Sequence, residues 1–217
     1  MKKIILFVVC FPVLFPVFAG AWGGRGHDTI CEVATHLVKN PNLKEHLKRK
    51  SNMMGHLCNI PDIHWSNMGG DINKVGAPTH YIDIEVISGK IKDVPADFQK
   101  IVDTYTGQPN KFKEGATIFS IPQEFGSAWW RADQFFRRGV ALKSTFEQAP
   151  PPANRKEEQD EKLAFNEAAY NLLVNMGVLG HFVGDISQPM HSTADYDGWA
   201  SGHGGLHSYY EDEVVGA

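Results

Sequence analysis

The sequence predicts an all-α fold with a single multi-helix domain, and three observations support this prediction. A chain of 217 residues is long enough for one ordinary domain with a sizeable core. The stretches rich in Gly, Pro and Asn separate segments in which apolar residues recur, and we find no internal repeats. Helical spacing of apolar residues is typical of five segments: His27–Val38, Leu43–Leu57, Phe98–Tyr105, Pro122–Phe146 and Glu161–Val183.

The first 21 residues have the composition of a secretory signal peptide, so we assign the domain to residues 22–217. Lys2 and Lys3 precede an apolar run, and Ala19-Gly20-Ala21 gives the small-x-small pattern of a cleavage site. This run is too short and too interrupted by proline to span a membrane, and no later run is long enough. We therefore expect a secreted or periplasmic protein without a transmembrane segment.

Charge and cysteine content limit the partners and the redox state. The formal net charge is −4 at pH 7 and becomes more negative when the leader is removed, which does not favour electrostatic capture of nucleic acid. Cys10 leaves with the leader, whereas Cys31 and Cys58 remain. In an oxidising compartment these two could form one disulfide, and the alternative is a pair of buried thiols.

Three stretches between the helical segments have other expected structures. Residues 60–78 (IPDIHWSNMGGDINKVGAP) are rich in Gly, Asn and Pro and are expected to be loop. Residues 79–86 (THYIDIEV) alternate as in a short strand. Residues 148–162 (QAPPPANRKEEQDEK) combine prolines with a charge run and are expected to be a solvated loop.

Two pairs of polar residues recur at helical spacing and indicate metal binding. His181 and Asp185 lie at i and i+4 near the end of the longest apolar segment, and His207 and Glu211 repeat the spacing. Burying such side chains is costly unless something satisfies them. Further candidates lie in turns and loops: His27, Asp62, His80 and His191.

Nitrogen and carboxylate ligands without cysteine suit zinc best. A single His-x3-Asp pair is a weak signal, but two such pairs with further His and Asp residues are much less expected by chance. The alternative is one structural zinc ion with incidental histidines.

These segments resemble the superfamily of zinc-dependent phospholipases C and P-one nucleases. The resemblance extends from Trp22 to Glu211 in the ligand segments, and the stretches between match poorly. It implies a helical domain with a trinuclear zinc cleft, in which the α-amino group freed by leader removal is a ligand. The ligand set that it implies is Trp22, His27 and Asp185 for one ion, Asp62, His80, His181 and the shared Asp185 for its neighbour, and His191, His207 and Glu211 for the third.

The resemblance implies hydrolysis of a phosphodiester by a zinc-activated water, with Asp62 as the general base. We expect a monomer. Trp22 and His27 are spaced as in the nucleases, whereas Glu211 and the short loop between His191 and His207 are typical of the phospholipases. We favour phospholipase C-like release of a phospholipid headgroup, and the alternative is cleavage of single-stranded DNA or RNA.

Other residues affect the choice of substrate. Trp65 stands where the nucleases often have a phosphate-binding Arg, but Ile63 and Ala77 stand where aromatic residues for choline would be expected. In the nuclease branch, an Asp at the position of Asp83 contacts the nucleobase. In this chain Asp83 is interpreted as a loop or helix-cap residue. His203 is interpreted as a surface residue, and a hydrogen bond to a metal ligand is the alternative.

The aromatic stretch Trp129–Gly139 (WWRADQFFRRG) is expected to pack in the core, and the alternative is a peripheral membrane contact. A last alternative concerns the C-terminus, because relatives continue beyond the position of Ala217 with further helices. The chain would then be a truncated relative that binds zinc without catalysis.

Overall fold

The computed structural model describes residues 22–65 and 69–216, and these residues are helical with connecting loops and without a named β-strand. The all-α prediction is confirmed for this part of the chain. The expected signal peptide, residues 1–21, lies outside the described residues. None of the described helices combines the length and the apolar character needed to cross a membrane.

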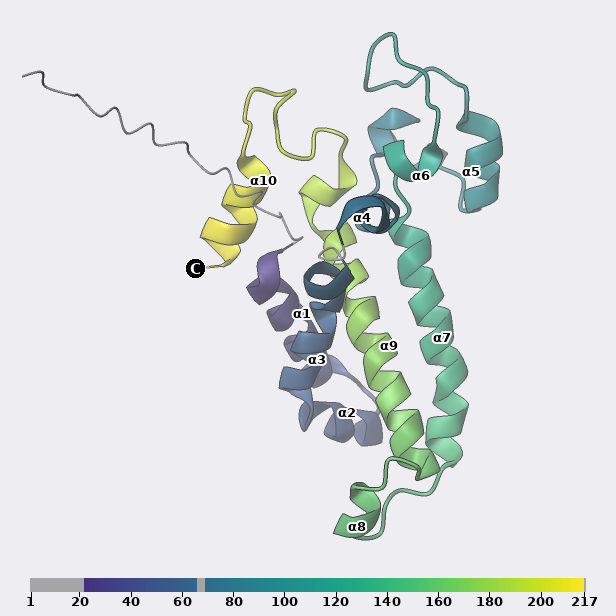
Figure 1. Cartoon of the computed structure of the whole chain (residues 1–217), viewed down its shortest axis with the longest axis vertical. Helices are drawn as coiled ribbons and strands as arrows, with labels where there is room; N and C mark the ends of the chain where they lie inside the picture. The colour runs from purple at the N-terminus through teal and green to yellow at the C-terminus, as the bar shows by residue number, and fades with distance from the viewer. Residues whose placement is uncertain (1–21, 66–68, 217) are drawn as a thin grey trace, which may run out of the picture.

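Two long helices, α7 (Ala128–Gln148) and α9 (Ala164–Ser187), lie side by side, and α1 (Gly23–Leu37) and α3 (Ser51–Cys58) pack against α9 as well (Figure 1). Because neighbours cover α9 on more than one side, it buries apolar residues all along its length. It extends past Val183, the last residue of the predicted apolar segment, and carries Asp185 as well as His181 before Pro189, as their spacing predicts.

Glycines of α9 allow the close approach of α1 and α3. A Cβ atom added at Gly177 would lie 2.4 Å from Leu57 Cβ, and one added at Gly180 would lie 2.2 Å from Cys31 Sγ. At the same point a disulfide joins Cys31 to Cys58 and ties α1 to α3. The structure therefore contains the disulfide and not the pair of thiols.

A second hydrophobic cluster lies at the N-terminal end of α7 and is centred on residues such as Ile82, Ile101 and Phe125. Helix α5 has the bounds that the sequence predicted. The short elements in this region are η4 (Ile84–Val86), η5 (Ile91–Asp93), α5 (Phe98–Tyr105) and α6 (Ile121–Glu124).

The structure corrects the prediction of one helix over Leu43–Leu57. Two helices, α2 (Pro41–Lys48) and α3, replace it. The charged run at residues 48–50 offers no apolar side chain to bury, so the chain turns there. The Asn40 side chain caps α2 by accepting a hydrogen bond from Leu43 N–H.

The prediction of loop over residues 60–78 was also wrong. This stretch contains a π-helical turn, η1 (Pro61–Trp65), then α4 (Gly70–Gly76) and the start of η3 (Ala77–Thr79). Glycine and proline in this stretch favour a loop, but Gly69 and Gly70 adopt positive φ at the start of α4, and proline is well tolerated in a first turn.

The short strand predicted at residues 79–86 is absent from the structure. Ile82 makes a single β-bridge with Gly126, and residues 84–86 form η4. Val86 and Ile87 are both buried, and burial of two consecutive side chains does not fit the alternation of a strand with one exposed face.

Two further boundaries differ from the predictions. The segment Pro122–Phe146 is divided between α6 and α7 at Gly126, whose φ of +89° ends the helical backbone beside Tyr81. Residues 148–162 are not entirely loop, because Asn154 caps a short helix, α8 (Arg155–Glu158), by accepting from Lys156 and Glu157 N–H.

Candidate metal centre

The first group of candidate ligands combines His27 of α1 with His181 and Asp185 of α9. All three residues are completely buried. Asp185 Oδ1 lies 3.3 Å from His27 Nε2, and Asp185 Oδ2 lies 3.2 Å from His181 Nε2. The absence of a side chain at Gly184 leaves room for the His27 ring, because a Cβ atom there would lie 3.2 Å from it.

The second group shares His181 and adds Asp62 of η1 and His80, which directly follows η3. His80 Nδ1 lies 3.0 Å from His181 Nε2, and Asp62 Oδ1 lies 3.6 Å from both nitrogens. His80 Nδ1 is also 2.9 Å from Asp185 Oδ2. The two carboxylate oxygens of Asp185 thus face different histidines, as expected of a carboxylate shared by two ions.

The third group joins His191 of η6 (Pro189–Ser192) to His207 of α10 (Leu206–Ser208) and Glu211 of η7 (Tyr209–Val215), a π-helical segment. His207 Nε2 lies 2.7 Å from Glu211 Oε1 and 3.1 Å from His191 Nε2. His191 Nδ1–H donates to His80 O over 2.7 Å, which connects this group to the second and leaves Nε2 free to bind a metal.

These groups fit zinc in two respects. Ligands at about 2.1 Å from a tetrahedral ion lie about 3.4 Å from one another, and the donor separations given above range from 2.7 to 3.6 Å. Buried polar atoms also lack hydrogen-bond partners in the described part of the chain. They include both ring nitrogens of His27, His181 Nδ1, Asp185 Oδ1, His207 Nδ1 and Glu211 Oε2.

The electrostatics of α9 favour metal binding. Burial by itself would raise the pKa of Asp185, yet the close imidazoles of His181, His27 and His80 hold that pKa well below its usual range. Burial lowers the pKa of His181, and the charge of Asp185 opposes this effect. At neutral pH Asp185 is therefore a carboxylate and His181 a neutral imidazole, the states in which both bind a metal.

The third group contains a supporting residue that the sequence analysis missed. Gln188 is completely buried, and its side-chain amide donates to Glu211 Oε1 over 2.5 Å. Burial would raise the pKa of Glu211, but hydrogen bonds from His191, His207 and Gln188 lower it to about 2. Burial likewise opposes the charged form of His191, yet the hydrogen bond to Glu211 and the Asp185 charge raise its pKa to about 8. In the sequence, Gln188 could have been noticed as a polar residue that lies between the predicted ligands Asp185 and His191 and directly before Pro189.

Trp22 lies against α9 near the first group. Its indole Nε1–H donates to Gly184 O over 2.7 Å, and its ring lies 5.7 Å from that of Tyr210. This contact holds the indole ring of Trp22 next to Gly184, the residue that precedes Asp185. The role of the Trp22 amino group as a metal ligand stays a prediction.

Asp83 and His203 lie outside the three groups of candidate ligands, and the sequence predicts other roles for them. Asp83 precedes η4 but its side chain makes no capping hydrogen bond. Burial and the nearby Glu85 raise its pKa to about 7. His203 is exposed, which confirms the interpretation as a surface residue.

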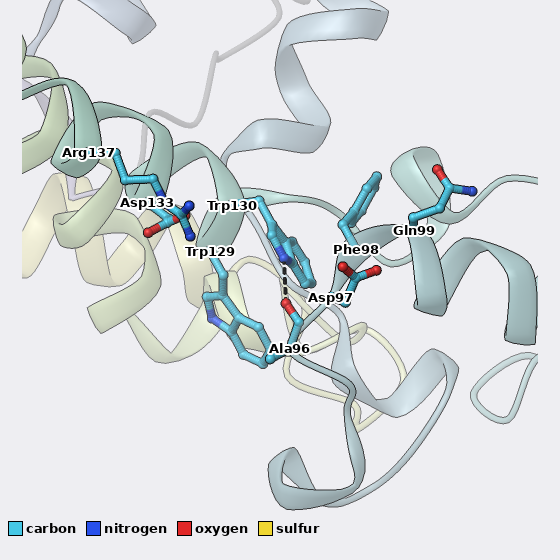
Figure 2. Close-up of a pocket in the computed structure, with 8 residues that line it drawn as sticks. All are labelled: Ala96, Asp97, Phe98, Gln99, Trp129, Trp130, Asp133 and Arg137. Carbon is cyan, nitrogen blue, oxygen red and sulfur yellow. Dashed lines mark hydrogen bonds and ion pairs between the residues drawn. The ribbon is translucent and has the colours of Figure 1, made fainter.

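The aromatic stretch at the start of α7 packs mainly on the protein. Trp129 and Trp130 are half-buried against the second hydrophobic cluster, and Trp130 Nε1–H donates to Ala96 O over 2.9 Å (Figure 2). With Phe98 they line an open pocket of about 570 Å³, and Phe136 is exposed. Packing against the core is thus confirmed for Trp129 and Trp130. A membrane contact through the exposed surface of these side chains and of Phe136 stays a prediction.

Comparison of the chain with protein-family models, with curated proteins and with solved structures gives no match. The donor atoms, their separations and their burial are therefore the basis for the chemistry proposed below.

Proposed function

We propose that the protein is an exported zinc-dependent hydrolase of phosphodiesters that binds three zinc ions. The observation that carries this proposal is the convergence of three His and carboxylate groups within one fold, with Asp185 facing the histidines of two of them. Adjacent ions are suited to phosphoryl chemistry because they can neutralise the attacking and leaving oxygens together. A single structural zinc ion would leave the other buried polar groups unexplained.

The ligand residues would then have separate tasks. Zinc bound by the first two groups would supply a nucleophilic water at neutral pH. Asp62 Oδ2 lies 3.7 Å from His27 Nε2, and Oδ1 lies 3.6 Å from His80 and His181, so this carboxylate stands between the groups. It is also partly exposed, at 19% of its side-chain surface. Asp62 can therefore accept a hydrogen bond from the water and take its proton.

The substrate that we favour is a phospholipid, with release of the phosphorylated headgroup. Glu211 and the short loop between His191 and His207 support this choice, whereas the spacing of Trp22 and His27 supports a single-strand nuclease. The test is hydrolysis of phosphatidylcholine vesicles and of single-stranded DNA by the zinc-loaded mature protein, with and without a chelator. Chelator-sensitive cleavage of DNA alone would replace the phospholipase by the nuclease, and bound zinc with activity on neither would favour the non-catalytic alternative.

A free amino group at Trp22 is expected to be required for full zinc loading. One extra glycine before Trp22 converts that amine into an amide, which is a poor metal ligand. We expect the extended chain to hold fewer zinc ions and to hydrolyse substrate about 10- to 100-fold more slowly. Metal analysis and initial rates measure both effects, with a glycine added at the C-terminus as control. Equal zinc content in the two chains would contradict this role of Trp22.

The peripheral membrane contact gives a further prediction. Replacement of Trp129 and Trp130 by Ala is expected to weaken binding to phosphatidylcholine vesicles about 10-fold, because indole rings partition into the interface. Vesicle co-sedimentation measures this binding, and circular dichroism verifies that the variant is folded. Leu37→Ala, which changes an exposed apolar residue of α1, is the control. Unchanged vesicle binding of the folded double variant would remove the membrane contact from the account.

A further inference from the structure

In the first two ligand groups, Asp62 and His80 are the described side chains that reach solvent. The side chains of Asp62 and His80 are 19% and 12% exposed, whereas those of His27, His181 and Asp185 are closed off. A substrate that reaches these groups must therefore approach past Asp62 and His80. Side chains near these two residues are candidates for contacts with the substrate.

Arg131 of α7 packs on the Phe182 ring, which also contacts two of the candidate ligands. Its guanidinium carbon lies 5.9 Å from the centroid of the Phe182 ring. That ring lies 5.4 Å from the ring of His80 and 5.1 Å from the ring of His181. Trp65, at the end of the η1 turn that contains Asp62, also contacts Phe182, at 6.5 Å between centroids. One aromatic ring thus separates Arg131 from the ligands.

Backbone contacts fix the first turn of α7 relative to His80. Ser127 N–H donates to Pro78 O over 2.7 Å, and the Ser127 hydroxyl donates to the same oxygen over 3.2 Å. Arg131 N–H donates to Ser127 O over 3.1 Å. Because His80 follows Pro78 by only two positions, the backbone of Arg131 is held at a defined distance from the metal centre.

The charge of Arg131 has no anionic partner in the part of the chain that the structure describes. Its Nη1–H donates over 2.9 Å to the neutral amide oxygen of Gln134, and its Nε is buried without a partner. On the same helix Arg137 pairs with Asp133 at 2.7 Å. A cation in the first turn of a helix is also opposed by the helix dipole. An anionic ligand would relieve both costs.

We propose that Arg131 binds a phosphate oxygen of the substrate that approaches past Asp62 and His80. The proposal rests on the proposed phosphodiester hydrolysis and names a substrate-binding residue for it. The guanidinium presents several N–H donors in a fixed plane and is well suited to phosphate. Stacking on Phe182 would keep this plane in place while the group exchanges its bond to Gln134 for one to the ligand.

Inorganic phosphate tests the proposal on the zinc-loaded mature protein. Arg131→Met keeps an unbranched apolar side chain over Phe182 and removes the charge, and Arg138→Met makes the same change at an exposed position of α7. Calorimetric titration is expected to show about 10- to 100-fold weaker phosphate binding for Arg131→Met, and wild-type affinity for Arg138→Met. Zinc content and thermal stability are measured on the same samples.

A second variant covers the case in which Arg131→Met fails to fold or loses zinc. Arg131→Lys keeps the charge but not the planar fork, so we expect phosphate affinity to fall about 3- to 10-fold. Wild-type phosphate affinity in either folded, zinc-loaded variant would overturn the proposal. Failure of the proposed function has a different signature, which is an absence of phosphodiester hydrolysis in the wild-type protein itself.

Discussion

Replacement of Asp185 by Asn is expected to reduce zinc-dependent hydrolysis about 1,000-fold, equivalent to about 4 kcal/mol in activation free energy. Its carboxylate oxygens lie 3.3 Å from His27 Nε2, 2.9 Å from His80 Nδ1 and 3.2 Å from His181 Nε2. The amide of Asn removes the negative charge and one of the two oxygens, so it cannot serve two ions in the same way. Initial rates with a soluble phosphodiester and metal analysis measure the effect.

The matched control for this prediction is Asp103→Asn. Asp103 is exposed on α5 and accepts a hydrogen bond from the nearby Gln99 side chain, so the same chemical change there leaves the candidate metal centre intact. We expect wild-type rate and zinc content for the control. An Asp185→Asn variant that retains both the rate and the full zinc content would show that Asp185 is not a shared ligand.

Removal of zinc is expected to lower the melting temperature by about 10 °C. Buried atoms such as Asp185 Oδ1 and Glu211 Oε2 have no hydrogen-bond partner among residues 22–65 and 69–216, and bound ions would satisfy them. Even one ion present at 1,000 times its dissociation constant adds about 4 kcal/mol to the free energy of unfolding. In a chain of this length each kcal/mol shifts the melting temperature by about 2–4 °C. Calorimetry of the chelated and dialysed protein, with the disulfide intact, measures the shift.

Addition of zinc to the chelated sample is the control, and it should restore the melting temperature. Addition of magnesium should not, because magnesium prefers oxygen ligands and the groups are rich in imidazole. An unchanged melting temperature in a sample verified as metal-free would mean that the three groups are stable without ions. The buried polar atoms would then need another explanation.

The parts of the candidate centre that the sequence predicted are those determined by local helical geometry. The pair His181 and Asp185 and the pair His207 and Glu211 each span four residues, so any helical backbone places their side chains on one face. The convergence of the two pairs with His80 and His191 is non-local. It depends on bonds such as His191 Nδ1–H to His80 O, which link distant positions of the chain.

The errors in the predicted secondary structure also have a local cause. Glycine and proline in residues 60–78 suggested a loop, yet the same residues begin the short helices that carry Asp62 and precede His80. The sequence predicts no separate role for Arg131 within the aromatic stretch Trp129–Gly139. Its place beside Phe182 follows from the packing of α7 on α9, which periodicity cannot give.

The central claim is that three zinc ions make this protein a phosphodiester hydrolase. The most direct test is a zinc titration of the metal-free mature protein, with bound zinc and hydrolysis of bis(p-nitrophenyl) phosphate measured on the same samples. We predict no hydrolysis without zinc, and a rate that rises to its maximum as three ions bind per chain. Full hydrolysis by the metal-free protein, or three bound ions without hydrolysis, would contradict the account.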